Sequence, residues 1–303
     1  MSNTPNNTST RNAQELVVGT SLWKDAFRRL MKNRMAVTCG ILFCLSCALF
    51  ILGPYVVEAT WGYTYDSQDL NYGPQPPSLH HWFGTDFFGR DLFTRVLYGG
   101  RVSLTVGLLA AVVSALIGMM YGAVSGYVGG RIDAIMMRIV DIIYALPYMF
   151  LVILLMTIFG RELWLVFIAL GMVSWLTTAR IVRGQVLSLK QQEFVKAARS
   201  IGTKDSAIIF RHLIPNTLGP IIVYFTLTVP SMILQEAFLS FLGLGVQAPR
   251  PSLGALINDG ANQMIVFWWT LVFPAVVMAT LLFSLNFLGD GLRDALDPKM
   301  KSR

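Results

Sequence analysis

The chain has 303 residues, of which 54% are hydrophobic and only 14% are charged. A soluble domain usually carries about 25% charged residues, so this composition excludes an ordinary soluble protein and indicates a membrane-embedded chain. The formal net charge of +7 is compatible with nucleic-acid binding, but the basic residues cluster in segments between long apolar runs, which argues against it.

The N-terminal arm, residues 1–34, is polar and basic. Its first part, Met1–Asn12, is rich in Asn, Thr and Ser, and we expect it to be disordered. In Ser21–Arg34, one helical face carries Trp23, Phe27, Leu30 and Met31. That pattern predicts an amphipathic helix on the membrane surface, although a plain basic flank to the first span explains the same charges. The arm shows no signal-peptide cleavage site, which predicts an uncleaved anchor.

Six runs without charged residues are long enough to cross a bilayer, which takes about 20 apolar residues. They are Met35–Val57, Val102–Val128, Ile142–Gly160, Leu163–Ala179, Leu213–Gln235 and Gly260–Gly289. The last run is too long to lie wholly in the membrane, so we expect its polar start, Gly260–Gln263, to lie outside. The sequence therefore predicts an all-α integral membrane protein with six transmembrane helices.

The three cysteines, Cys39, Cys44 and Cys47, all lie in the first span. Cys44 and Cys47 have the spacing of a redox or metal motif, but neither a His nor a second Cys pair accompanies them. A free cysteine behaves as a small apolar residue, so we expect helix-packing residues and no metal site.

The distribution of Lys and Arg predicts the orientation. With six spans both termini lie on one side, and that side carries 19 of the 24 basic residues. It is therefore predicted to be cytoplasmic. The cytoplasmic parts are the arm (1–34), the turn at Arg131–Arg138, the segment 180–212 and the tail (291–303). The first span (35–57) leads to an outer loop at 58–100.

The second half of the outer loop has the pattern of an amphipathic helix. Phe88, Leu92 and Val96 fall on one side, and Asp91 and Arg95 are spaced to pair at i,i+4. His80 and His81 have no third ligand nearby, so we interpret them as surface-loop residues.

The second span carries a small residue at every fourth position: Ser114, Gly118, Gly122 and Gly126. Small residues at that spacing let two helices approach closely. The pattern leaves open whether the second helix belongs to this chain or to a partner subunit.

Four residues in or near the spans are candidates for a solute pathway or gate: Asp141, Pro147, Pro230 and Glu236. Prolines bend spans, and ionisable groups in a bilayer are costly, so both kinds often mark a pathway. A structural role is the alternative for each, with Arg138 as the expected partner of Asp141. The spans contain no series of acids and bases such as a proton-coupled pump needs.

The segment 190–215 is the most informative part of the cytoplasmic side. Phe194, Ala197, Ala198 and Ile201 follow helical spacing, Gly202 is a helix stop and Thr203 a candidate cap for a second short helix. Pro215 is expected to open the fifth span. Such a hairpin suits docking of a cytosolic partner, but periodicity alone equally allows an interfacial hairpin without one.

This segment resembles the ATPase-coupling loop of ABC importer permeases in six residues at matching positions: Glu193, Ala197, Ala198, Gly202, Ile214 and Pro215. The resemblance extends over about residues 21–298. It includes Phe83-Gly-Thr-Asp-Phe-Phe-Gly-Arg-Asp-Leu, Gly100-Arg-Val-Ser-Leu, Glu236-Ala-Phe-Leu-Ser-Phe-Leu-Gly-Leu-Gly and Gly289-Asp-Gly-Leu-Arg-Asp-Ala-Leu-Asp-Pro. These motifs are similar to the peptide and nickel subfamily, and above all to its C-type oligopeptide permease subunits.

The resemblance implies a type I ABC importer permease fold, with a permease domain at 101–290, in a bacterial inner (plasma) membrane. It implies a pore shared with a second permease, two cytosolic ABC ATPases on the coupling loops, and an external binding protein that is periplasmic or extracellular. The chain has no Gly-x-x-x-x-Gly-Lys-Ser/Thr motif, so ATP and Mg²⁺ would bind to the partner ATPases and this subunit would be non-catalytic.

Two alternatives concern function. Related systems carry dipeptides, nickel chelates or cell-wall peptides instead of oligopeptides. An ion-coupled secondary transporter is the competing class, and it would leave the coupling-loop pattern unexplained.

Overall fold

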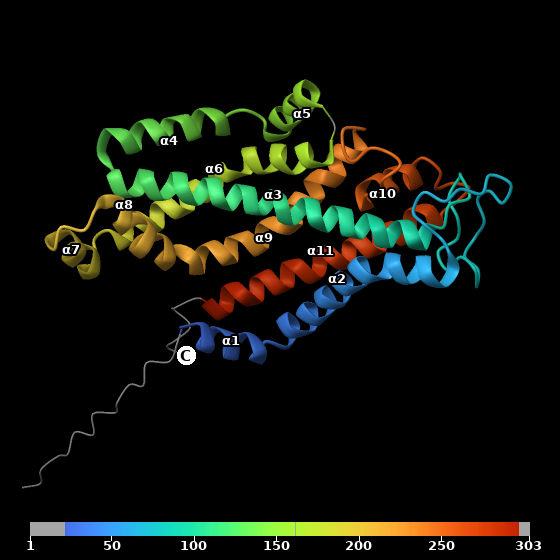
Figure 1. Cartoon of the computed structure of the whole chain (residues 1–303), viewed down its shortest axis with the longest axis horizontal. Coiled ribbons are helices and arrows are strands. Elements are labelled where there is room, and N and C mark those ends of the chain that lie inside the picture. The colour runs from blue at the N-terminus through green and yellow to red at the C-terminus, as the bar shows by residue number, and fades with distance from the viewer. Residues whose placement is uncertain (1–21, 161, 297–303) are drawn as a thin grey trace, which may run out of the picture.

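The computed structural model describes residues 22–160 and 162–296, apart from the side chains of Leu22, Trp23 and Leu163. The expectations for residues 1–21, for the Trp23 side chain, for Arg161 and for the tail after Leu296 lie outside the described residues. In the described part the regular structure is helical (Figure 1): α1 (Leu22–Lys32), α2 (Arg34–Trp61), α3 (Leu92–Val128), α4 (Gly130–Tyr144), α5 (Tyr148–Phe159), α6 (Leu163–Leu189), α7 (Glu193–Ser200), α8 (Asp205–Ala207), the π-helix η1 (Ile208–Leu213), α9 (Ile214–Phe241), α10 (Leu253–Ala261) and α11 (Trp269–Leu296).

Five helical stretches are long and apolar enough to cross a membrane, and a bent pair, α4 with α5, brings the number of spans to six. The five are α2, α3, α6, α11 and the continuous stretch Asp205–Phe241. The prediction of an all-α membrane protein with six spans is therefore confirmed. Several bounds differ from the predicted ones: α3 begins earlier, at Leu92, α6 ends later, at Leu189, and α11 begins only at Trp269.

The third span is broken at Pro147, where the sequence predicted a bend. α4 ends at Tyr144, α5 starts at Tyr148, and their axes differ by 84°. Pro147 precedes α5 and disfavours the helical conformation at Leu146, so the helix breaks there.

The helices form an elongated bundle with two distinct ends (Figure 1). α1, α7, α8 and the last turns of α11 lie at one end, which we call the α7 end. The loop between α2 and α3 and the short helix α10 lie at the other, the α10 end. At the α7 end α1 packs on α11, with Ala26 buried, but Phe27 and Met31 are exposed. The predicted apolar face of this helix is thus only partly covered by protein.

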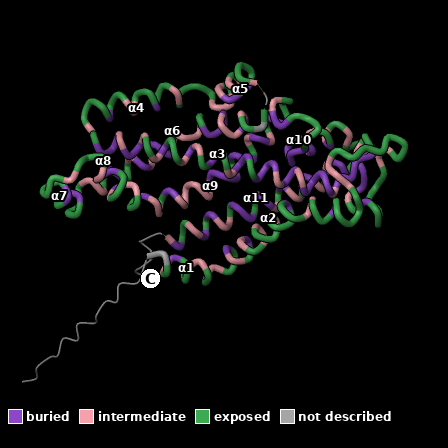
Figure 2. Tube along the Cα trace, in the orientation of Figure 1, coloured by how far each residue is buried: buried purple, intermediate pink, exposed green. Residues whose placement is uncertain are grey.

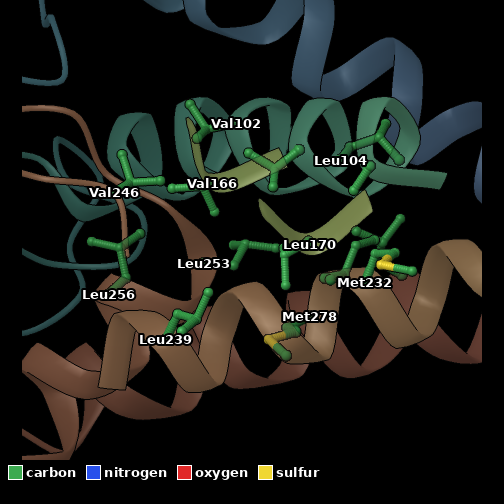
Figure 3. Close-up of a cluster of buried hydrophobic side chains, with 14 of the residues drawn as sticks. Val102, Leu104, Val166, Leu170, Met232, Leu239, Val246, Leu253, Leu256 and Met278 are labelled. Atoms are coloured by element: carbon green, nitrogen blue, oxygen red, sulfur yellow. The ribbon is translucent and has the colours of Figure 1, made fainter. Parts of the chain in front are cut away.

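Burial is concentrated along α3 and the helices beside it (Figure 2). The main apolar cluster joins α3 to α6, α9, α10 and α11. Figure 3 shows how side chains from these helices meet, among them Val102, Leu170, Met232, Leu253 and Met278. The faces of α2 and α4 that point away from this cluster stay exposed and apolar, as expected for surfaces in contact with lipid.

The small residues of α3 pack against α6 of the same chain. A Cβ atom at Gly122 would overlap the carbonyl oxygen of Ala179, and one at Gly126 would lie 2.9 Å from the carbonyl oxygen of Arg183. In the same crossing, a Cβ at Gly171 of α6 would lie 2.9 Å from the carbonyl oxygen of Ala110. The stripe is thus an intrachain contact between two backbones, which decides between the two readings of the pattern.

The outer loop contains no separate amphipathic helix, so that prediction is wrong. Asp91 caps α3 instead, its carboxylate accepting from the Thr94 backbone N–H at 2.7 Å. Its other oxygen lies 2.9 Å from Nδ1 of His81, which is buried and not a surface residue. The predicted Asp91–Arg95 pair does not form, because the carboxylate already serves the cap; Arg95 lies nearest Asp86 instead.

Gly122→Ala should destabilise the protein. The added methyl group overlaps a backbone oxygen, which cannot move aside by changing rotamer as a side chain could. Overpacking of this kind costs about 1–3 kcal/mol. The measurement is the thermal midpoint of the detergent-solubilised protein. Gly184→Ala on α6 is the matched control, since no described atom lies within 4 Å of its added Cβ. It should leave the midpoint unchanged or raise it slightly, and equal midpoints for the two variants would contradict the close packing.

Candidate functional site

α7 has one face anchored in the bundle and one face open. Val195 and Ala198 are buried, whereas Phe194 and Ala197 are exposed and Ile201, just after the helix, is 83% exposed. Of the four residues that share helical spacing in the sequence, only Ala198 faces the bundle. The other three present an apolar surface at the α7 end. Glu193, the first residue of the helix, is also exposed.

The turn after α7 confirms Gly202 as the helix stop. Its φ is +78°, its N–H donates to the Arg199 carbonyl at 2.9 Å, and the Thr203 N–H donates to the Ala198 carbonyl at 3.0 Å. These two bonds form a Schellman motif. They place Thr203 inside the turn, so the next helix is preceded by Lys204 and the predicted capping role of Thr203 is wrong.

The second short helix runs directly into the fifth span. Asp205–Phe241 is one continuous helical stretch, with π-helical bonding over Ile208–Leu213. Pro215 is the second residue of α9, so it opens the α-helical part of the fifth span as predicted, while the helical stretch as a whole begins at Asp205. A π turn is one way for a helix to accommodate a proline, which lacks a backbone N–H. The α-helical partner that Pro215 cannot serve is the Arg211 carbonyl, four residues earlier. The Asn216 side chain donates to the neighbouring His212 carbonyl at 2.6 Å. Ile214, half-buried, is the first residue of α9.

A second apolar cluster anchors α7 and η1 to the helix bundle. Its buried members come from α3, α6, α7, η1 and α9: Ala123, Tyr127, Val182, Val186, Val195, Ala198, Ile208, Ile209, Leu213 and Ile221. The segment 193–213 is thus packed against the spans.

Tyr127, at the end of α3, makes polar contacts that hold this segment. Its hydroxyl donates to the Asp205 carboxylate, and the Arg199 guanidinium lies 4.9 Å from the centre of its ring. The Lys190 ammonium donates to the Tyr127 carbonyl. One residue of α3 therefore connects the ends of α6, α7 and α8.

A partly buried ion pair joins α4 to α6 beside this contact. Arg183 donates through Nε and Nη2 to the two carboxylate oxygens of Asp133, both at 2.6 Å, and Ser125 of α3 donates to the same carboxylate. Such a two-bond pair is rigid in orientation as well as strong. Movement of α6 at this end is consequently passed to α4.

Asp141 does not pair with Arg138 as expected. Its carboxylate accepts from Arg180 of α6 at 2.7 Å, and both side chains are largely exposed. The guanidinium also lies 4.3 Å from the Tyr144 ring centre. The sequence spacing favoured Arg138 as the partner of Asp141. The fold instead brings α6 alongside α4, so Arg180 reaches the carboxylate.

A cavity of about 500 Å³ lies between α4, α5, α6 and α9. Tyr148 sits at its centre: its hydroxyl lies 2.8 Å from the Ser174 hydroxyl and donates to the Gln235 side-chain oxygen. The other polar residues in the wall are Tyr144, Thr177, Tyr224, Thr228 and Ser231. None of the four pathway candidates is itself a wall residue, but Pro147, Pro230 and Glu236 each adjoin one in sequence.

Glu236 and Asp141 are not among the wall residues. Glu236 is fully buried. Its carboxylate accepts from Ser103 of α3 at 2.9 Å and from Ser240 at 2.8 Å, while Ser103 accepts from the Leu253 N–H of α10 at 3.1 Å. It therefore joins three helices, which favours the structural alternative for this residue.

The sequence analysis did not single out Tyr127, Asp205, Asp133, Arg183 or Tyr148. For Asp133, Arg183 and Asp205 the detectable signal was a charged residue near the end of a span, where the free-energy cost of an ion is lowest and partners are close. Pairing them across helices requires the tertiary arrangement. No group of three or more metal-binding side chains occurs in the described part of the chain, so nothing there resembles a metal centre.

Comparison with known proteins decides the family. Residues 115–302 match the model of the binding-protein-dependent transport system inner membrane component. The chain belongs to this family of permeases. Residues 21–77 match the N-terminal transmembrane domain of oligopeptide transport permease C.

The permease is also similar to individual curated proteins over nearly its whole length. It is 55% identical over 285 residues to the oligopeptide transport system permease protein OppC of Escherichia coli strain K12, covering 93% of each chain. The OppC protein of Salmonella typhimurium is 54% identical, with the same coverage. The dipeptide transport system permease protein DppC of Bacillus subtilis is 48% identical over 93% of this permease and 87% of its own length. The resemblance to C-type ABC importer permeases, with their type I fold, is therefore confirmed.

Tyr127→Phe should loosen α7 and α8. The variant keeps the ring beneath Arg199 but loses the hydrogen bond to the Asp205 carboxylate, and a bond to a charged group contributes about 1.5–3 kcal/mol. Backbone amides of 193–207 should therefore exchange about tenfold faster or more, as measured by hydrogen–deuterium exchange. Tyr121→Phe is the control on the same helix, because that hydroxyl donates to the Met136 carbonyl of α4. Unchanged exchange in Tyr127→Phe would show that the apolar cluster alone holds the segment.

Proposed function

We propose that this chain is the permease subunit of an ATP-driven importer of oligopeptides. It shares the pore with a second, related permease, and it works with two cytosolic ABC ATPases and an external peptide-binding protein, periplasmic or extracellular. The family description and the printed names of the oligopeptide relatives support this assignment. The dipeptide relatives support a dipeptide substrate less strongly, because their identity is lower. Nickel chelates and cell-wall peptides remain substrates of the same transporter class.

The open face of α7 carries the proposal. Phe194, Ala197 and Ile201 are apolar and exposed on a segment whose other side is fixed by Val195 and Ala198. A rigid exposed apolar surface marks a protein–protein contact. The small side chain of Ala197 lets a partner approach the helix, and Lys196 and Arg199 supply polar contacts around it. We assign this face, with Glu193, Ala197, Ala198, Gly202, Ile214 and Pro215 forming its loop, to the ATPase.

The proposed orientation places the α7 end in the cytoplasm of a bacterium, with the chain in its inner membrane. Nineteen of the 24 Lys and Arg residues belong to segments assigned to that side. α1 and the last turns of α11 lie at the same end (Figure 1), which agrees with both termini being cytoplasmic.

We assign no catalytic residue and no resident cofactor to this chain. ATP and Mg²⁺ would bind to the partner ATPases, because the sequence has no phosphate-binding Gly-rich motif. The chain's part is mechanical. The helix that starts at Asp205 beside α7 continues to Gln235 in the wall of the Tyr148 cavity, about 45 Å away at 1.5 Å per residue. Closure of the ATPases would rock this helix as a rigid body and change access to the cavity.

Ala197→Trp tests the docking face. Ala197 is exposed, so a larger side chain there fits the isolated permease but holds an ATPase away from the helix. Co-purification of the ATPases should be lost, and ATP-dependent peptide uptake into proteoliposomes should fall at least about tenfold, as for an obstructed interface centre.

Ala59→Trp is the matched control: the same residue type, exposed on α2 near the α10 end. It should keep both ATPases and uptake. If Ala197→Trp also keeps them, α7 is not the docking face. Uptake that persists after all ATPases are removed would favour a secondary transporter driven by an ion gradient instead.

A further inference from the structure

A second large cavity, of about 640 Å³, opens at the α10 end. Its wall comes from the loop before α3, from the segment between α9 and α10, and from α10 itself. It shares no lining residue with the Tyr148 cavity. Four charged residues line it: Arg90, Arg95, Arg250 and Asp259.

Arg95, in the first turn of α3, is only 4% exposed, and its guanidinium is incompletely hydrogen-bonded among the described residues. Among the described residues, its Nε and Nη1 atoms have no hydrogen-bond partner. Asp86 is the nearest acid, with Oδ2 3.5 Å from Nε, which is too long for a good hydrogen bond. A buried charged donor without a partner is costly, so this guanidinium is prepared for a ligand.

The carboxylate of Asp86 is already engaged by closer donors. Arg90 donates to it through Nε at 2.8 Å and through its backbone N–H at 3.0 Å, and the Phe88 N–H donates at 2.9 Å. Asp86 therefore gives its hydrogen bonds to Arg90 and Phe88, and it faces Arg95 as an ion-pair partner at 3.5 Å without a good hydrogen bond.

The cavity has a positive balance. Three arginines, Arg90, Arg95 and Arg250, and one acid, Asp259, line it, and Asp86 pairs with Arg90 beside it, which leaves one net positive charge (three minus two). Arg250 is exposed at the rim, and the amides of Gln68, Gln247 and Asn258 also line the wall. A guanidinium with free donors matches a carboxylate better than any other common ligand group.

We propose that this cavity receives the C-terminal carboxylate of the incoming peptide, with Arg95 as the residue that binds it. The inference rests on the proposed function and adds a recognition site to it. Every unmodified peptide carries this group whatever its side chains, so one arginine serves a transporter of varied sequences. The site lies at the end that the proposed orientation places outside, where a peptide first meets the permease.

The test compares a peptide with a free C-terminus and the same peptide amidated there. The complete transporter is reconstituted in proteoliposomes, and uptake is measured against the concentration of binding protein loaded with one peptide or the other, after loading is confirmed. The unmodified transporter should show a KM about tenfold or more lower for the free acid, the effect of one charge-assisted bond. Arg95→Gln should reduce this ratio to near one by raising the KM for the free acid alone.

Arg95→Lys keeps the charge without the two-pronged geometry and should retain part of the preference. Arg250→Gln at the exposed rim should also lower the preference for the free acid. This variant tests the proposal if the transporter with Arg95→Gln does not assemble. Arg101→Gln is the control on the same helix, since Arg101 contacts Tyr55 and lines a different pocket. It should keep the full preference.

Two results would overturn the proposal. One is an unchanged preference for the free acid in Arg95→Gln and Arg250→Gln. The other is an equal rise in KM for both peptides, which would mean that Arg95 binds an acidic group of the binding protein. Uptake of either peptide without ATP would instead count against the proposed function. The ratio of the two KM values would still test the carboxylate site in that case.

Discussion

The close approach of α3 to α6 is the contact on which the rest of this permease depends. Lipid tails are as apolar as leucine, so helices in a bilayer gain little from burying apolar side chains and must associate through dispersion contacts at short range. Glycines at Gly118, Gly122 and Gly126 bring the two backbones together along about three helical turns. α9, α10 and α11 then pack around this pair through the main apolar cluster.

The α7 segment is built on the end of the same pair. Tyr127 is the last but one residue of α3, and Arg183 and Lys190 belong to the last turns of α6 and its end. A displacement applied at α7 therefore meets two helices that cannot slide past one another without separating their backbones. The helical stretch that starts at Asp205 is fixed to the same pair, by the hydrogen bond from Tyr127 to Asp205 near one end and by the hydrogen bond from Ser103 to Glu236 near the other. The α7 segment and the helix that reaches the Tyr148 cavity therefore share one support.

Much of this arrangement was predictable from the sequence, and the failures have common causes. Uncharged runs predict spans because each ion in the bilayer is costly, and Gly202 predicts a helix end because its left-handed φ suits no other residue as well. Predicting partners from i,i+3 or i,i+4 spacing failed where the fold or a helix cap supplied another partner. Asp141 found Arg180 and not Arg138, and Asp91 found His81 and the Thr94 N–H and not Arg95. The break at Pro147 was flagged as a bend, but its 84° depends on how α5 packs on α6.

The turn at Gly202 keeps its shape through the backbone of the chain itself. No described atom lies within 4 Å of a Cβ built there, so the position has room for any side chain and restricts only the torsion angle. Glycine visits that left-handed conformation without penalty, whereas a β-branched residue reaches it only at a cost of about 1–2 kcal/mol. The conformation of the hairpin is accordingly set by its own backbone torsion angles and does not require a bound subunit.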